Sequence, residues 1–246
     1  MKTKVFVVVP RSWQELTDTQ LYYLYGLFSE ALSLAQIKTC CLFRWGGLKV
    51  VCRYGNGYLI RQGKMEFPVT AEVIAGAIHA LDWIDTFAER PVRIGKISGH
   101  QAVDAEFIGV SFETYLYCDN LYQGYLETQN HDLLGQMAEQ LYRFPKIRLN
   151  KVEKISIFYW WASLKALFAR EFPNFLQPAE YNPDNLLDAG TGNSLQQAMN
   201  AQIRALTKGD ITKEREVLNM DTWRALTELD AQAAEYEEIN RKYGKS

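Results

Sequence analysis

The segment most like a cofactor-binding turn is Asp188-Ala189-Gly190-Thr191-Gly192. In nucleotide-binding and methyl-donor-binding folds, glycines at this spacing let a phosphate or a cofactor approach the backbone at a helix N-terminus. Here the preceding apolar run is only Leu186-Leu187, among prolines, and only 54 residues follow Gly192 in a helical pattern. We therefore interpret the segment as a linker with a helix cap. A methyl-donor or nucleotide enzyme using Asp188, Gly190 and Gly192 is kept as the alternative.

The histidines and cysteines lack the spacing of a metal site or a nucleophile site. No two of the three histidines, His79, His100 and His131, are four residues apart, and none has a cysteine nearby. The four cysteines, Cys40, Cys41, Cys52 and Cys118, include no pair with metal-ligand spacing. No Walker loop, zincin motif or Gly-x-Ser-x-Gly elbow occurs. We predict a non-enzymatic protein without catalytic residues, cofactor or metal, with buried, reduced thiols.

The composition is that of a globular protein. Of its 246 residues, 48% are hydrophobic and 23% are charged, and the formal net charge is −2. A charge this small gives no general attraction to nucleic acid or to an anionic membrane. The N-terminal apolar run, Val5–Val9, is too short for the core of a signal peptide, so we expect no export.

Charge is distributed unevenly along the C-terminal half. The stretch from Pro145 to Glu171 carries a net charge of +4, and the stretch from Asp210 to Ser246 carries −3. We interpret the basic stretch first as a solvated rim. A docking surface for the acidic tail helix ranks second, and a nucleic-acid contact ranks last.

One long helix is expected to form the core. The stretch Glu153–Phe172 places apolar side chains on almost every face, which is typical of a buried helix. Its uninterrupted apolar run, Ile155–Ala162, is far shorter than the roughly 20 residues that a membrane span needs. We therefore predict a core helix that buries Trp161.

The N-terminal part combines helices with a small sheet. Capping boxes at Thr17–Gln20 and Ser33–Gln36 each predict the start of a helix, and a third helix is expected from Ala71 to about Phe87. Asn56-Gly57, between two strand-like runs, predicts a hairpin, and Val5–Val9 predicts a further strand. The fold class that follows is α+β, mainly α-helical, with a small antiparallel β-hairpin or sheet near the N-terminus.

Prolines and glycines divide the chain. Residues 173–193 contain three prolines and two glycines and show no hydrophobic periodicity of a helix or a strand. This stretch therefore predicts a linker. The expected domains are a mainly helical α+β core over 1–172, the linker over 173–193, and a helical C-terminal extension over 194–246.

The last predicted helix, Asp221 to about Tyr243, carries an apolar seam with the alternating three- and four-residue spacing of a coiled coil. The seam positions are Leu226, Leu229, Ala233, Tyr236, Asn240 and Tyr243. Glu237 with Arg241, and Glu238 with Lys242, are predicted ion pairs four residues apart. A stripe of aromatic and leucine side chains is typical of an interface. The predicted partner-binding residues are Trp223, Leu226, Leu229, Tyr236 and Tyr243. The alternative, which we rate as equal, is that the stripe packs on its own domain.

Three stretches together resemble uncharacterised tail-module proteins of phages and prophages of gut bacteria. They are PRSWQELTDTQLYYLYGL, SFETYLYCDNLYQGYLETQNHDLLGQMAEQLYR and LQQAMNAQIRALTKGDITKEREVLNMDTWRALTELDAQAAEYEEINRKYG. The second contains an aromatic helix followed by a Leu-rich helix. Proteins of this kind are often suspected tail-assembly chaperones, and the resemblance brings no catalytic residue with it.

The resemblance implies a protein that assists tail assembly by binding another tail protein in the cytoplasm of the bacterial host. The tape-measure protein is one candidate partner, and we expect no membrane and no nucleic-acid partner. A structural component of the virion is the alternative within the same class. The sequence predicts no oligomeric state.

Overall fold

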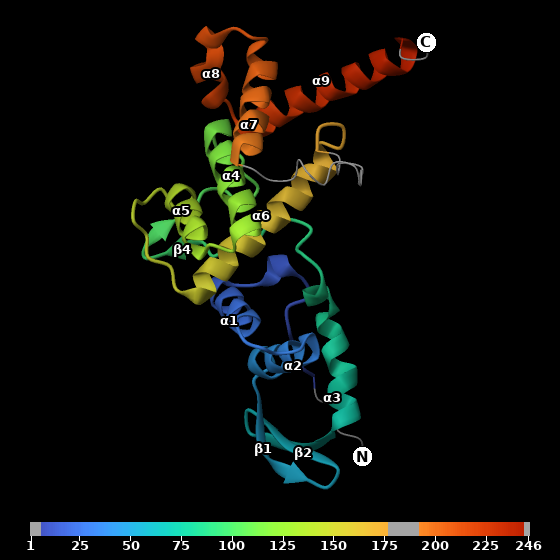
Figure 1. The fold of residues 1–246 in the computed structure, drawn as a ribbon. Helices are drawn as coiled ribbons and strands as arrows, with labels where there is room; N and C mark the ends of the chain where they lie inside the picture. The colour runs from blue at the N-terminus through green and yellow to red at the C-terminus, as the bar shows by residue number, and fades with distance from the viewer. Residues whose placement is uncertain (1–5, 177–191, 244–246) are drawn as a thin grey trace. The chain divides into compact units, whose positions relative to one another are not determined.

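The computed structural model describes residues 6–176 and 192–243, which group into two compact units (Figure 1). The first unit runs to Ala88 and includes Lys151–Ser156, and the second comprises Glu89–Asn150 and the described residues from Ile157 onward. This grouping is not the predicted division at 173–193. Residues 177–191 of the predicted linker lie outside the described residues, so that division stays a prediction.

The predicted fold class is confirmed. The described residues are mainly helical, with a three-stranded antiparallel sheet near the N-terminus and a two-stranded antiparallel pair further along the chain. Both capping boxes form: the Thr17 and Ser33 hydroxyls each accept the backbone N–H of the glutamine three residues on.

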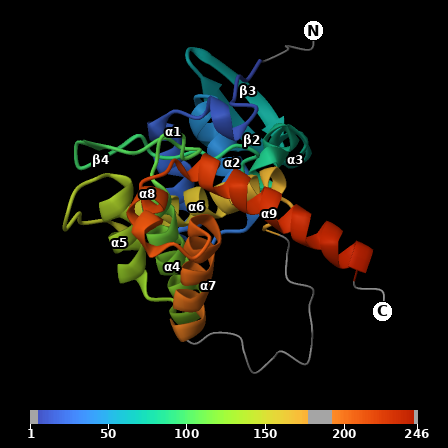
Figure 2. The same cartoon turned by 90° about the horizontal axis from the view of Figure 1, so that it is seen from above.

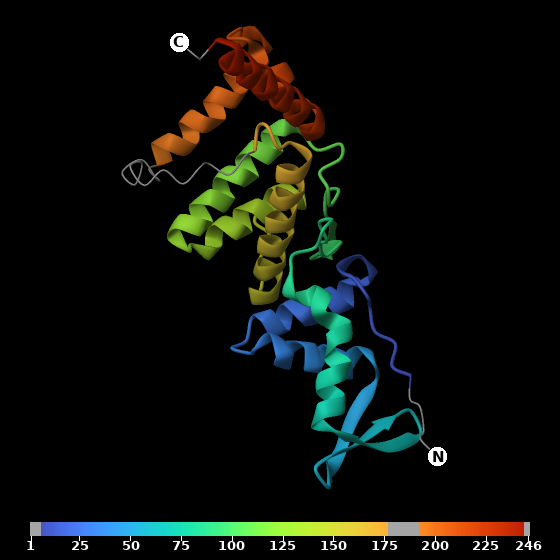
Figure 3. The ribbon, with the colours of Figure 1, turned by 90° about the vertical axis from the view of Figure 1, so that its right-hand side faces the viewer.

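The first unit combines a helical layer with the sheet. Its helical elements and strands are η1 (Trp13–Glu15), α1 (Asp18–Phe28), α2 (Leu34–Trp45), β1 (Leu48–Tyr54), β2 (Gly57–Gln62), β3 (Met65–Thr70), α3 (Ala71–Ala77) and η2 (Ile78–Asp85). The strands form a meander in the order β1-β2-β3. Within this unit, α3 leaves the sheet at the end of β3, and η2 continues beside α2 (Figure 3).

The sheet contains one strand more than the predicted hairpin. The predicted hairpin forms, with its turn at Gly55-Asn56, one residue before Asn56-Gly57, because Gly57 already belongs to β2 and lies opposite Tyr54. Residues 65–70, for which no strand was predicted, form β3, in which Pro68 lies opposite Leu59. Proline has no N–H to donate and is tolerated in an edge strand, and β3 is at the edge of this sheet.

Two sequence-based predictions in this unit are wrong. The described part of Val5–Val9 forms no strand, because it has no ladder partner; only the Gln62 side-chain amide donates to the Phe6 carbonyl, at 3.4 Å. The single helix expected from Ala71 to Phe87 forms instead as α3 followed by η2, and η2 itself is kinked at Leu81, whose φ is −113°. The kink lets the second element bury Leu81 and Ile84.

A buried lysine links α2 to η2. The Lys38 ammonium donates to Asp82 at 2.7 Å and to Asp85 at 2.5 Å. Burial by itself lowers the pKa of Lys38, but the bonds to the two carboxylates outweigh it and raise the pKa. This lysine is therefore a charged structural residue.

The second unit is built from packed helices. Its elements are β4 (Lys96–Ile97), β5 (His100–Gln101), α4 (Phe112–Thr128), α5 (His131–Leu141), α6 (Lys151–Glu171, of which Ile157–Glu171 belongs to this unit), α7 (Gly192–Thr207), η4 (Ile211–Lys213), α8 (Glu214–Leu218) and α9 (Thr222–Tyr243). Helix α4 lies against α5 and also contacts α7, α8 and α9.

Helix α6 forms the centre of this core, as predicted. Trp160 and Trp161 are 1% and 0% exposed. The Trp161 ring lies 5.3 Å from Phe107 and 6.0 Å from Tyr115, on neighbouring segments. The Trp160 indole N–H donates to the carbonyl of Ala105 at 2.8 Å. Two adjacent indoles thus use both sides of one helix for packing.

Candidate interaction surface on the C-terminal helix

The start of α9 is fixed to the loop before α4. One Asp221 carboxylate oxygen accepts the backbone N–H groups of Trp223 and Arg224, at 3.0 and 3.3 Å, which caps the helix. The other accepts the N–H of Gly109 at 2.7 Å. The Thr222 hydroxyl, fully buried, donates to the carbonyl of Val110 at 2.8 Å. The first turn of α9 therefore has its polar groups bonded within the unit.

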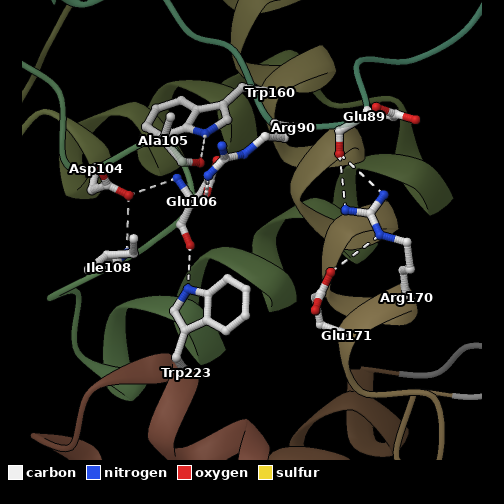
Figure 4. Close-up of polar contacts among 10 residues, drawn as sticks. All are labelled: Glu89, Arg90, Asp104, Ala105, Glu106, Ile108, Trp160, Arg170, Glu171 and Trp223. Atoms are coloured by element: carbon white, nitrogen blue, oxygen red, sulfur yellow. Dashed lines mark hydrogen bonds and ion pairs between the residues drawn. The ribbon is translucent and has the colours of Figure 1, made fainter.

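Trp223 packs within the second unit. Its indole N–H donates to the Glu106 carbonyl at 2.7 Å (Figure 4), and its ring lies 5.5 Å from Phe168 and 5.4 Å from Phe172. Figure 4 also shows the Trp160 indole bonded to the preceding carbonyl, that of Ala105. Indoles from α6 and α9 thus hold two successive carbonyls of one loop.

The two predicted leucines lie in the core. Leu226 is 0% exposed and Leu229 is 3% exposed. Together with Trp223, they place three of the five predicted partner-binding residues against their own unit. This is the alternative that the sequence left open for the inner half of the stripe.

Asp230 joins α9 to the turn that follows α6. Its carboxylate accepts the backbone N–H groups of Asn174 and Phe175, at 2.8 and 3.0 Å, and the Asn174 side-chain amide at 2.8 Å. These bonds satisfy two backbone N–H groups of the turn that follows α6.

Replacing Asp230 with alanine is expected to lower the free energy of unfolding by about 2 kcal/mol, because bonds to a charged acceptor contribute roughly 1.5–3 kcal/mol. Glu235→Ala, on the exposed part of the same helix, is the matched control and should change it by less than about 0.5 kcal/mol. Denaturant unfolding followed by circular dichroism measures both. Equal effects from the two variants would contradict the assignment.

The outer half of α9 lies outside the buried core of its unit. Every residue from Glu235 to Tyr243 is exposed, and Tyr236, Ile239 and Tyr243 are 66%, 54% and 77% exposed. Figure 2 shows this half of the helix projecting beyond the other helices of its unit. At 3.6 residues per turn these three side chains fall within an arc of roughly 60°. They form one apolar stripe, here called the outer stripe.

Sequence reasoning identified two of the three residues of the outer stripe and missed Ile239. The predicted coiled-coil seam passed through Asn240 instead. The missed signal is spacing: Ile239 is three residues after Tyr236 and four before Tyr243, which places it on their face. The predicted pair Glu238–Lys242 forms at 2.5 Å and supports the helix here.

The residues that were weighed for chemistry are scattered. Asp188 and Gly190 lie outside the described residues, and Gly192 starts α7. His79 bonds to Asp82 at 3.0 Å on the surface, His100 stacks on Phe144 with ring centroids 3.7 Å apart, and His131 lies near a tyrosine ring. Across residues 6–176 and 192–243, no group of three or more His, Cys, Asp or Glu side chains could hold a metal ion.

The buried thiols are not activated. Burial is the main cause that raises the pKa of Cys41 to about 12, and it also raises the pKa of Cys118. A raised pKa lowers the thiolate fraction at neutral pH, and the thiolate is the nucleophile. These two cysteines therefore serve as small apolar core residues.

A polar cavity of about 560 Å³ lies beside the start of α9. Two carboxylates line it, those of Glu139 and Asp221. Glu139 accepts the backbone N–H of Lys146 at 2.9 Å, and Asp221 caps α9. Both acids are thus used to fix local backbone, and we assign no reaction to the cavity.

Compared with protein-family models, with curated proteins and with solved structures, the chain matches none. The likeness to phage tail-module proteins therefore rests on the three sequence stretches quoted above. Among the described helices, none combines the length and the apolar character needed to cross a membrane.

Proposed function

We propose that the protein is a non-enzymatic phage or prophage protein that assists tail assembly by binding another tail protein. The observation that carries the proposal is the outer stripe, in which Tyr236, Ile239 and Tyr243 are all exposed. On this proposal the protein acts in the cytoplasm of the bacterial host, and the tape-measure protein is the first candidate partner.

The physical argument starts from helix stability. Most helical stability in proteins comes from packing an apolar face, and a short segment on its own is marginal in water. The apolar face of the outer half of α9, formed by Tyr236, Ile239 and Tyr243, is exposed in the described chain. Exposed tyrosines at helical spacing are also typical of the residues by which a helix binds in a groove. A protein partner that covers the outer stripe would stabilise the helix by packing its apolar face, and it would use the exposed tyrosines as binding residues.

The choice of a tail protein as partner rests on the resemblance, which involves the first helix, the α4–α5 region and the whole of α7–α9. A structural component of the virion is the alternative, since it would use the same stripe permanently. The methyl-donor or nucleotide enzyme, with Asp188, Gly190 and Gly192, has no observation that favours it.

The test is binding to tail proteins encoded by neighbouring genes, beginning with the tape-measure protein. The double variant Tyr236→Asp/Ile239→Asp is expected to weaken the Kd by at least about 30-fold, since each hot-spot side chain contributes roughly 2 kcal/mol or more. Ile211→Asp is the matched control, because Ile211 is 83% exposed but lies outside the stripe. Binding that is equally strong in the double variant and the control would contradict the proposal.

A further inference from the structure

The first unit contains an apolar groove between the sheet and its helices. The groove has a volume of about 270 Å³, and all eleven lining side chains are apolar. They come from α2 (Leu42), the sheet (Ile60, Phe67) and α3 (Val73, Ile74), among others. A cavity for a drug-sized ligand measures roughly 300–1,000 Å³. This groove is smaller, and its size suits a few inserted side chains.

Exposed apolar side chains continue the groove along the sheet. Val50 lies opposite Ile60, which lies opposite Phe67, so the three share one face. Met65 belongs to the same face, two residues before Phe67. Val50, Met65 and Val73 are 54%, 55% and 60% exposed. Apolar surface of this kind, gathered around a groove, is typical of a binding site.

The groove and the outer half of α9 carry opposite charge. Residues 42–77, which supply every lining side chain except Val7, contain five basic and two acidic side chains, a net charge of +3. Residues 235–243 contain three acidic and two basic side chains, a net charge of −1. Such complementarity favours encounter between the two surfaces and fixes which surface meets which.

We propose that the groove of one copy binds the outer half of α9 from a second copy, with Tyr236, Ile239 and Tyr243 as the inserted side chains. Their spacing of three and four residues is that of a helix bound in a groove. The two contacting surfaces differ, so the contact is heterologous and leaves a free groove at one end and a free helix at the other. Copies therefore join head to tail.

The inference deepens the proposed function, on which it rests, because both use the outer stripe. A tail protein that covers the stripe would compete with self-association. Free protein would then form short head-to-tail assemblies, and the tail protein would release them. The acidic residues around the stripe would be shared by both contacts, so raising the salt concentration should weaken self-association.

The test is sedimentation velocity of the full chain alone, over a concentration range up to about 1 mM, the weak limit of specific binding. Three variants are compared. Tyr236→Asp removes the helix surface, Val73→Asp removes the groove surface, and Ile211→Asp is a control on neither surface. Val73 is in the first turn of α3 and 60% exposed, so an acidic residue there is compatible with the helix. Circular dichroism confirms that each variant is folded.

The expected result has three parts. The unchanged chain and the control associate with rising concentration, and each surface variant alone stays at the 28.3 kDa mass of one chain. An equimolar mixture of Tyr236→Asp and Val73→Asp forms a complex of two chains and nothing larger, because only one intact helix and one intact groove can meet. The Kd for self-association of either surface variant should be at least tenfold higher than that of the unchanged chain.

Several results would overturn the inference. They are an unchanged chain that stays monomeric throughout, a mixture that forms no two-chain complex, or a Val73→Asp variant that still associates through its helix. Because this experiment contains no tail protein, its failure leaves the binding test of the proposed function unaffected. Loss of tail-protein binding, with self-association intact, would overturn only the proposed function.

Discussion

Replacing Trp161 with alanine is expected to lower the free energy of unfolding by about 3–5 kcal/mol, the range for removing a fully buried aromatic side chain. Trp161 is 0% exposed, and its ring packs against Phe107, Tyr115 and Tyr122 at centroid distances of 5.3, 6.0 and 6.5 Å. The surrounding helices cannot close the space without moving these rings. Urea unfolding followed by far-ultraviolet circular dichroism measures the change.

The matched control for this variant is Tyr236→Ala, an aromatic residue that is 66% exposed. It should change the free energy of unfolding by less than about 0.5 kcal/mol. A loss below about 1 kcal/mol for Trp161→Ala would mean that α6 is not the centre of the second unit.

Of two truncations in the C-terminal region, one should destabilise the second unit and the other should leave its stability almost unchanged. A chain that ends after Gly209 loses Trp223, Leu226 and Leu229 and uncovers the rings of Phe168 and Phe172. Burying each large apolar side chain contributes roughly 1.5–3 kcal/mol, so the loss is about 5–8 kcal/mol. This is comparable with the whole stability of many domains, roughly 5–15 kcal/mol. We expect the second unit of this shorter chain to lose its fixed packing.

A chain that ends after Ala234 removes only exposed residues of α9 and the residues that follow it. It should keep its Tm within about 2 °C, because surface changes alter stability by less than about 0.5 kcal/mol. Thermal unfolding and binding of a dye specific for exposed apolar surface compare the two chains. If the chain ending after Gly209 binds no more dye and unfolds at the same temperature, the inner half of α9 does not belong to the core.

Local signals in the sequence identified much of the fold. Asn56-Gly57 marked the hairpin, in whose turn Gly55 has a φ of 54°, and the hydroxyl–glutamine pairs marked the starts of α1 and α2. These features depend on neighbours in the chain. The strand β3 was missed because Pro68 argues against a strand, and only its edge position in the sheet makes the proline acceptable.

Features that depend on distant partners could not be predicted. The β-branched run at the N-terminus was expected to be a strand, but Phe6–Val9 has no neighbouring strand to pair with. The sequence identified the apolar stripe on α9, but it did not show which residues of the stripe are buried and which are exposed. The exposed residues of the stripe follow Asp230, whose bonds to Asn174 and Phe175 come from a turn more than fifty residues earlier. The sequence therefore predicted the helix, and the structure divided it into a packed half and an exposed half.

The central claim is that the outer stripe on α9, exposed in the described part of the chain, is covered by a partner molecule. Hydrogen–deuterium exchange of the Val73→Asp variant, at a concentration where it is monomeric, tests this most directly. Amides of Glu235–Tyr243 should exchange at close to the rate of a free peptide, because local opening there costs almost nothing, while those of the buried inner turns around Leu226 stay protected. Addition of the tail protein that binds the outer stripe should slow the exchange of the amides of Glu235–Tyr243. Equal protection of both halves in the monomer would contradict the account.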